Sequence, residues 1–324
     1  MVVPLDDASV RMLHAVKSAL AAETSSDVRC VLDRSLPRVD VSSRRTSFLE
    51  IAERAGVACP AHAEVRSLRE ALRFAHRCGW PVYLKRDNTA GGSGVRLCAS
   101  PAELTAAFAA LTNTAGPIWS AAGVLRRGRR TMHAMGLGAG PGISIQSVIP
   151  GEPAFHSAVA LDGRWLAGLS AEVEEFHPRP TGPSTRVLLH GDRAMDDIAR
   201  RLIGALGYSG FCGFDFIRDR AGNLTLLELN ARPTPVSHLG GLVGLDLCVA
   251  LNAALSGQPV PSATPKPPRR VALFPQDWVR DPIGTSREHC DRDIPLNDPA
   301  LLEAMAANLP HGWDNGRAGA CQSG

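Results

Sequence analysis

The sequence predicts an α+β protein, because amphipathic helices and β-hairpins are mixed along the chain rather than repeated as βαβ units. Apolar residues at helical spacing follow capping residues in several segments, and short apolar runs end at Pro-Gly or Asp-Gly turn signals. The chain has 324 residues, of which 44% are hydrophobic, and no internal repeat. That length suits roughly two domains and is ample for a buried core.

Helices are expected where a capping residue precedes an apolar stripe and a glycine follows it. Capping boxes begin at Ser67 and Ser100, each with a glutamate three residues later. Gly56, Gly79 and Gly207 each suit the position after a helix. The predicted helices cover about residues 6–20, 45–55, 67–78, 101–112, 192–206 and 242–255, with a short helical pattern at 299–307.

Strands are expected in the apolar runs between turn signals. Pro150-Gly151 and Asp162-Gly163 separate three successive runs, and a polar turn at 219–222 joins two more. The stretch 113–142 is irregular, and 258–270, with five prolines, is expected to be a connector. The predicted strands are residues 81–85, 95–98, 143–149, 154–161, 165–173, 211–218 and 223–229.

Composition argues against several classes of protein. Lys and Arg number 35 against 32 Asp and Glu, and this net charge of +3 is too small to indicate a nucleic-acid or membrane surface. No apolar run approaches the about 18 residues that a membrane helix needs, and the acidic start does not suit a signal peptide. The eight cysteines include no C-x-x-C pair, so we expect reduced thiols in a cytoplasmic protein.

The most informative segment is an acidic hairpin at residues 213–232. If its turn centres between residues 221 and 222, Asp215 lies directly opposite Glu228. Opposed Cβ atoms are only about 4.5–5.5 Å apart, so two carboxylates there repel each other unless a cation compensates them. Mg²⁺ meets this need, because it takes one or two carboxylates and completes its shell with water and phosphate oxygens.

The second strand of this hairpin extends the predicted site. Its period of two puts Asn230, and also Arg232, on the same face as Glu228. Asparagine adds a neutral oxygen ligand, and arginine offers a fork for phosphate or carboxylate. The alternative is a hairpin whose acids are merely solvated, which we consider weaker because an opposed pair between large apolar neighbours is uncommon.

A lysine and a glycine-rich loop predict a phosphate clamp. Lys85 ends the run 81–85, and Gly91, Gly92 and Gly94 follow it. Glycines let backbone N–H groups approach phosphate oxygens, and lysine supplies a point charge. The loop is neither a P-loop nor a dinucleotide fingerprint, since it lacks GxxxxGK[ST] and leads into a strand. Alone it fits a solvated strand end, but the acidic hairpin favours the clamp.

Together these motifs resemble the ATP-grasp superfamily, which includes biotin carboxylase, carbamoyl-phosphate synthetase and D-alanine–D-alanine ligase. The family's closing pattern is an acidic residue followed on the next strand by Glu-x-Asn, often with Arg two further, and Asp215, Glu228, Asn230 and Arg232 match it. The resemblance implies that the first three hold Mg²⁺ or Mn²⁺. It also implies that Arg232 holds the acyl substrate or the phosphoryl group during transfer.

The resemblance also implies an ATP site. Arg45, eleven positions before Gly56, takes the place of the family's usual lysine and is expected with Lys85 at the α- and β-phosphates. The loop of Gly91, Gly92 and Gly94 matches the family's flexible flap. The adenine hinge is expected at four consecutive residues, in which Gln replaces the usual Glu: Gln146, Ser147, Val148 and Ile149.

The implied architecture is the ATP-grasp fold, in which two α+β lobes clamp MgATP. Residues 43–128 would form the small lobe with its lead-in helix, and 129–257 the large lobe with the metal site. Residues 1–42 would be only the last strand–helix unit of an amino-terminal domain. Residues 258–324 would be the connector and tail.

The implied activity is that of an ADP-forming ligase. Such an enzyme transfers the γ-phosphoryl group of ATP to a carboxylate, and an amine or thiol then displaces phosphate from the acylphosphate. Two alternatives stay open, a kinase acting on a hydroxyl and a catalytically inactive ATP-binding remnant. The expected partners are these small molecules, without nucleic acid or membrane, and a homodimer is the assembly to test.

Overall fold

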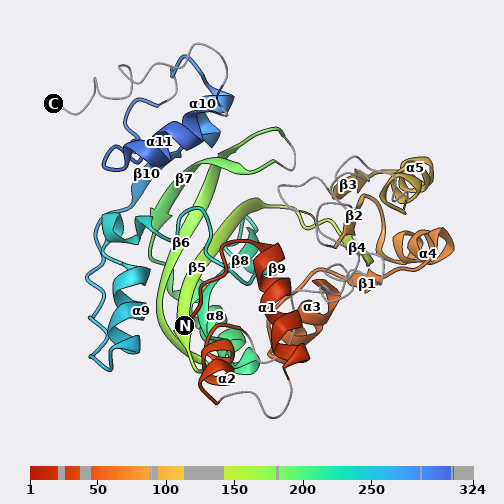
Figure 1. Cartoon of the computed structure of the whole chain (residues 1–324). Helices are drawn as coiled ribbons and strands as arrows, with labels where there is room; N and C mark the ends of the chain where they lie inside the picture. Colours follow the sequence, from red (N-terminus) through yellow and green to blue (C-terminus); the bar gives the residue numbers. More distant parts are fainter. Residues whose placement is uncertain are drawn as a thin grey trace.

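Two sheets organise the chain, one of four strands and one of seven (Figure 1). The computed structural model describes residues 1–20, 26–36, 45–87, 89, 94–112, 142–179, 182–284, 287–307 and 309. Within that part of the chain, no helix is both long and apolar enough to cross a membrane. The mixed α+β character predicted from the sequence is confirmed.

The small sheet has the order β1-β4-β2-β3, and each neighbouring pair is antiparallel. Helices α4 (Leu68–Cys78) and α5 (Pro101–Thr112) cover it and bury Phe74 and Leu104 against Val82 and Leu84. Because β4 pairs with both β1 and β2, the small sheet takes in residues beyond the division expected at residue 129. Its strands are β1 His62–Glu64, β2 Val82–Arg86, β3 Val95–Cys98 and β4 Ile143–Ser147.

The large sheet has the order β11-β10-β7-β6-β5-β8-β9. Its pairs are antiparallel except for β10 with β11. Side chains alternate along β5, so Ala158 and Ala160 enter the core on one face while Val159 and Leu161 enter the core on the other. The strands are β5 Glu152–Leu161, β6 Arg164–Phe176, β7 Ser184–His190, β8 Gly210–Arg218, β9 Leu224–Asn230, β10 Arg269–Leu273 and β11 Asp291–Asp293.

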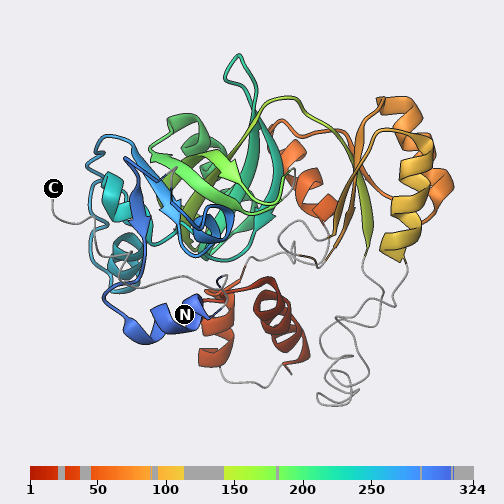
Figure 2. The same ribbon diagram turned by 90° about the horizontal axis from the view of Figure 1, so that it is seen from above.

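Helices cover both faces of the large sheet. Those on the face of α8 include α3, which lies between the two sheets, and α1, which forms a pair with α2 at one side of the molecule (Figures 1 and 2). On the other face α9 packs against β5 and β6. The helices not yet given are α1 Asp7–Ala19, α2 Ser26–Asp33, α3 Arg45–Arg54, α8 Arg193–Leu206, α9 Leu247–Leu255, α10 Gln276–Arg280 and α11 Pro299–Ala306.

Most predicted helices form with the capping that their sequences indicate. The Ser67 hydroxyl accepts a hydrogen bond from the Glu70 N–H at 3.3 Å, and the Asp192 carboxylate accepts from two N–H groups in the first turn of α8. Gly207 ends α8 at a φ of 55°, in the left-handed region that glycine tolerates best. Local chemistry therefore sets these boundaries.

Several elements differ from the expectations, and α2, α10, β1 and β11 were not predicted. The helix expected from residue 242 begins at Leu247, because Leu239–Val243 form a 3-10 turn that Gly244 ends at a φ of 74°. Strand β7 was not predicted, and the expected connector runs into strand β10 at Arg269. Residues 1–5, expected to contain a strand before the first helix, have none.

Candidate functional site

The acidic hairpin has the predicted register where it matters for the site. Asp215 on β8 pairs with Glu228 on β9, and Gly213 pairs with Asn230. Nearer the turn the register shifts by one residue between Asp215 and Phe216. A bulge at Leu227 causes this shift, since Phe216 pairs with Leu226. The expected facing of the two acids is confirmed, whereas the simple pairing rule is wrong beyond them.

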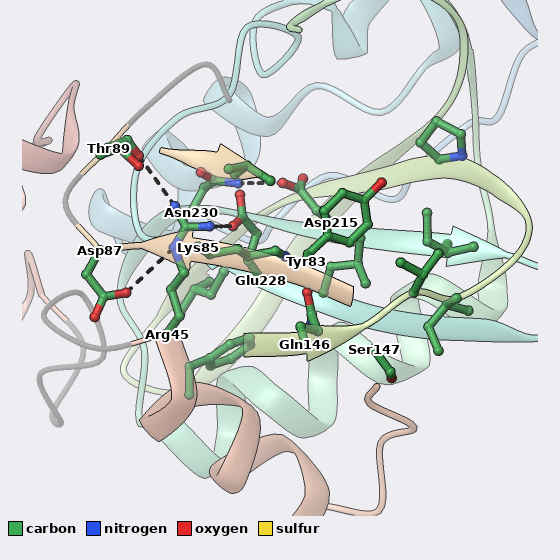
Figure 3. Close-up of a pocket in the computed structure, with 18 of the residues that line it drawn as sticks. Arg45, Tyr83, Lys85, Asp87, Thr89, Gln146, Ser147, Asp215, Glu228 and Asn230 are labelled. Carbon is green, nitrogen blue, oxygen red and sulfur yellow. Dashed lines mark hydrogen bonds and ion pairs between the residues drawn. The ribbon is translucent and has the colours of Figure 1, made fainter. Parts of the chain in front are cut away.

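Burial of the opposite face directs the two acids into a cavity. Phe214 and Phe216 are 0% and 1% exposed and lie in the core beneath the hairpin. Phe214 stacks on Phe48 of α3 with ring centroids 6.4 Å apart. Because neighbouring residues of a strand point to opposite faces, Asp215 points away from this core, as Figure 3 shows.

The cavity has a volume of about 640 Å³ and receives side chains from both sheets. The small sheet contributes Lys85, and the first turns of α1 and α3 close one side. The segment between β4 and β5 lines another part of the wall. Its lining includes Asp7, Arg11, Arg45, Phe48, Tyr83, Lys85, Asp87, Thr89, Val95, Gln146, Ser147, Val148, Ile149, Glu152, Phe176, Arg179, Asp215, Glu228, Asn230 and Arg232.

Each of the three predicted metal-ligand side chains has a partner within the chain. The Arg45 guanidinium donates to Glu228 Oε2 at 2.5 Å, and the Asn230 amide donates to Asp215 Oδ2 at 3.1 Å (Figure 3). Arg232 Nη2 donates to Asn230 Oδ1 at 3.2 Å. Cationic and amide groups of the chain thus compensate the acidic pair.

The pKa values of the two carboxylates are shifted in opposite directions. Burial, and then the neighbouring Glu228 charge, raise the pKa of Asp215 well above its ordinary value. Burial acts on Glu228 in the same direction, but Arg45 and Lys85 outweigh it, so the pKa of Glu228 lies below its ordinary value. A further cation between the two groups would therefore favour ionised Asp215.

The donor set fits a hard divalent cation that is bound together with another ligand. Asp215, Glu228 and Asn230 supply oxygen donors of the kind Mg²⁺ prefers. In the described ranges no cluster of three or more His, Cys, Asp and Glu side chains forms a complete metal site. Mg²⁺ ordinarily keeps one or two carboxylates and fills its remaining positions with water and phosphate. The residues present match that partial shell.

Lys85 lies where a phosphate clamp was expected. It is 8% exposed on β2, beside the acidic pair in Figure 3. Burial lowers the pKa of Lys85 to about 8 even though the Glu228 charge opposes that shift. A buried ammonium group that lines a cavity is suited to bind an anion that enters it.

Arg45 does not stand free for phosphate as expected. Besides Glu228, its guanidinium reaches the Thr89 carbonyl at 3.4 Å and lies 3.8 Å from the Asp87 carboxylate. It therefore bridges the hairpin and the segment after β2. A phosphate role for Arg45 would have to use donors other than the Nη1 group bonded to Glu228, or break that bond.

The glycine loop is described only in part. Gly91 and Gly92 lie outside the described residues. Gly94 accepts a hydrogen bond from the Arg86 N–H at 2.9 Å, and a Cβ there would lie 2.1 Å from the Thr89 hydroxyl. Glycine is thus required at 94 for close packing, while Thr89 and Val95 line the cavity.

The predicted hinge residues all line the cavity. Gln146 is 3% exposed on β4, and its side chain points into the cavity in Figure 3. The three residues after it, Ser147, Val148 and Ile149, continue the wall toward β5. Their backbone groups lie at the crossing between the two sheets, as expected for a hinge.

The sequence did not predict the contribution of α1. Asp7 Oδ1 accepts from Arg232 Nε at 2.9 Å, so a residue at the beginning of the chain holds the predicted substrate arginine. Arg11, one helical turn later, lines the same cavity. The i, i+4 spacing of these two charges was visible in the sequence, but nothing local indicated what α1 would contact.

Comparisons with known proteins agree with the motifs. A family model described as "Carbamoyl-phosphate synthase L chain, ATP binding domain" matches residues 44–125. The carbamoyl phosphate synthase large chain of Thermotoga neapolitana is 22% identical over 241 residues, which cover 71% of this chain and 20% of that protein. Multifunctional protein pyrABCN of Emericella nidulans is 23% identical over 256 residues, which cover 77% of this chain and 10% of that protein. The chain thus spans a fifth or less of these relatives.

Solved structures share the fold. Biotin carboxylase of Campylobacter jejuni, in a β-γ-ATP complex, aligns with a TM-score of 0.57 and 16% identity over 73% of this chain and 51% of that chain. Carboxyaminoimidazole ribonucleotide synthase of Aspergillus clavatus, complexed with ATP, aligns with a TM-score of 0.54 and 13% identity over 77% of this chain and 68% of that chain. The predicted ATP-grasp fold is confirmed.

Proposed function

We propose that the chain is a Mg²⁺- and ATP-dependent ligase that activates a carboxylate as an acylphosphate and releases ADP. The observation that carries the proposal is the opposed pair of Asp215 and Glu228 in one cavity with Lys85. Arg45 and Lys85 act on this pair as cations of the chain, so one cavity offers oxygen donors for a metal and positive charge for phosphate. Magnesium bound to a nucleotide would use both sets of groups.

The nucleotide would lie along the cavity with its base at the hinge. Gln146 and the backbone of Ser147 to Ile149 would bind adenine, and the phosphates would extend toward Lys85. The Lys85 ammonium then supplies positive charge inside a water-poor site, where it acts more strongly than in solvent. Complexes of similar folds with ATP support this arrangement.

The metal would be held by Asp215, Glu228 and Asn230. When bound, Mg²⁺ would supply neutralisation of the negative charge on the transferring phosphoryl group. Arg45 donates to Oε2 of Glu228, so a metal would share this carboxylate with Arg45 or displace it from Oε2. The Arg45 guanidinium would then lie near the phosphates, as expected for the residue at this position.

Phosphoryl transfer depends mainly on how the reacting groups are positioned and on neutralisation of their negative charge. Arg232 would hold the carboxylate that accepts the γ-phosphoryl group, with its guanidinium fixed by Asp7 and Asn230. An amine or thiol then attacks the acyl carbon, and inorganic phosphate leaves. The similarity to carbamoyl phosphate synthase and to carboxyaminoimidazole ribonucleotide synthase supports activation of a carboxylate rather than of a hydroxyl.

A trapping assay tests the proposal. The chain is incubated with MgATP, a panel of carboxylates and hydroxylamine, and both ADP and hydroxamate are measured. We expect ADP and hydroxamate in equal amounts with the true substrate, and neither with Glu228→Gln. A stable phosphoester without hydroxamate would instead identify a kinase. Failure of the chain to bind ATP in a Lys85-dependent manner would exclude both activities.

A further inference from the structure

Helix α1 places two charged residues in the lining of the cavity, beside Arg232, which is proposed to hold the acyl substrate. Its N-cap Asp6 accepts a hydrogen bond from the Ser9 N–H, and Val10 is 1% exposed in the main core. Asp7 and Arg11 lie one turn apart on this fixed helix, and both line the cavity. Side chains at i and i+4 lie on the same helix face, with Cβ atoms about 5–6 Å apart.

Asp7 determines how Arg232 is presented. Arg232 donates through Nε to Asp7, through Nη2 to Asn230 and through Nη1 to the Pro233 carbonyl at 3.2 Å. These three contacts hold the guanidinium plane beside the acidic hairpin. A carboxylate that meets Arg232 is thereby held next to the proposed metal ligands, where the reacting group belongs.

The proposed function gives no role to Arg11. The other arginines of the cavity are engaged: Arg45 with Glu228, Arg179 with Glu175 at 3.0 Å, and Arg232 with Asp7. Among the described residues Arg11 has no hydrogen bond or ion pair, and its charge acts only on exposed Asp6, whose pKa it helps to lower. A half-buried guanidinium that lines a cavity is suited to bind an anionic group.

We infer that Arg11 binds a second anionic group of the acyl substrate, so that the substrate class is a short dicarboxylate. This inference rests on the proposed function, which uses Arg232 for the reacting carboxylate. Because Arg11 lies one turn of α1 beyond the residue that holds Arg232, the two anionic groups would be separated by a few carbon atoms. A monocarboxylate would leave Arg11 without a partner.

The test uses isothermal titration of the whole chain saturated with Mg²⁺ and a non-hydrolysable ATP analogue. The probes are acetate, succinate and glutarate. We expect succinate or glutarate to bind about tenfold or more tighter than acetate, because one more charge-assisted pair forms. Arg11→Gln should remove that advantage and leave affinity for acetate and for the nucleotide analogue within about twofold of the original.

Two further variants separate binding from folding. Arg11→Lys keeps the charge without the fork and should retain part of the dicarboxylate preference. Arg69→Gln makes the same charge change at an exposed position of α4 and should change nothing. Circular dichroism melting verifies that each variant is folded.

The outcomes are distinct. Equal affinity for acetate and both dicarboxylates, or a dicarboxylate preference that survives Arg11→Gln, would overturn the role of Arg11 while leaving nucleotide binding intact. Absence of Lys85-dependent nucleotide binding would instead overturn the proposed function.

Discussion

Replacing Glu228 with glutamine gives the sharpest test of the acidic pair. The substitution removes one negative charge with almost no change in volume. The carboxylate of Glu228 faces Asp215 across the ribbon and pairs with Arg45 at 2.5 Å. Stability and activity should therefore respond very differently to the change.

The effect on stability should be small because two terms oppose each other. The Arg45–Glu228 side chains are 23% and 28% exposed, and an ion pair of that kind contributes up to about 1 kcal/mol. Opposed like charges on a ribbon cost at most about 0.2–1 kcal/mol, and the raised pKa of Asp215 already relieves part of that cost. The net loss in the free energy of unfolding should therefore stay below about 1 kcal/mol, which corresponds to less than about 4 °C in Tm.

The effect on activity should be large. Loss of one of two carboxylate ligands removes much of the affinity for Mg²⁺, and turnover should fall by at least about 100-fold. The assay is ADP release with MgATP, with thermal melting measured in parallel. Glu50→Gln makes the same change on an exposed position of α3 and serves as the matched control. Wild-type turnover in Glu228→Gln, or collapse of its fold, would refute the reasoning.

Two other predictions concern the site, and a third concerns the ion pair of Glu172 on β6 with His190 on β7. Lys85→Ala should weaken binding of a nucleotide analogue by about tenfold or more, because a buried charge-assisted contact is lost; calorimetry giving an unchanged Kd would contradict the phosphate role. Removal of Mg²⁺ with EDTA should weaken the same binding in the original chain and much less in Glu228→Gln. The Glu172 carboxylate, 3.5 Å from the His190 ring, raises the pKa of His190 above its ordinary value of 6.5. That stabilisation is complete below pH 6.5 and is lost as pH rises through the folded pKa, so urea unfolding should show stability falling across this range by at most about 1.4 kcal/mol per pH unit. His190→Gln should have a flatter pH profile, and an unchanged slope would show that another group titrates.

The pairing of Asp215 with Glu228 could be predicted from the local sequence, because the position of the turn allows only a few ways to pair the two strands of a hairpin. The alternation of Phe214, Asp215 and Phe216 already indicated which face is buried, and the structure agrees. The bulge at Leu227 had no such signal, since every residue from 226 to 229 fits a strand. Pairing near the turn therefore could not be predicted, while pairing at the site could.

Elements that depend on distant partners were missed. Strand β7 pairs with β6 and β10, and although Thr185, Val187 and Leu189 alternate at strand spacing, this signal was overlooked. Strand β10 follows a proline-rich stretch with little strand character. The contact between Asp7 and Arg232 joins residues 225 positions apart. No spacing rule spans that distance, so the role of α1 in the site required the structure.

The pairing of Arg45 with Glu228 has a consequence for how metal and nucleotide would bind. Without a metal, Arg45 compensates the Glu228 carboxylate, and the Asn230 amide compensates Asp215. A divalent cation on the proposed ligands would compete with both contacts and so would weaken the hold of Glu228 on the Arg45 guanidinium. A nucleotide phosphate arriving at that guanidinium would then compete less with Glu228, whereas a phosphate arriving first would face the full contact between Arg45 and Glu228. Each ligand would therefore favour the other, because both draw on the same arginine, and linkage makes this coupling reciprocal.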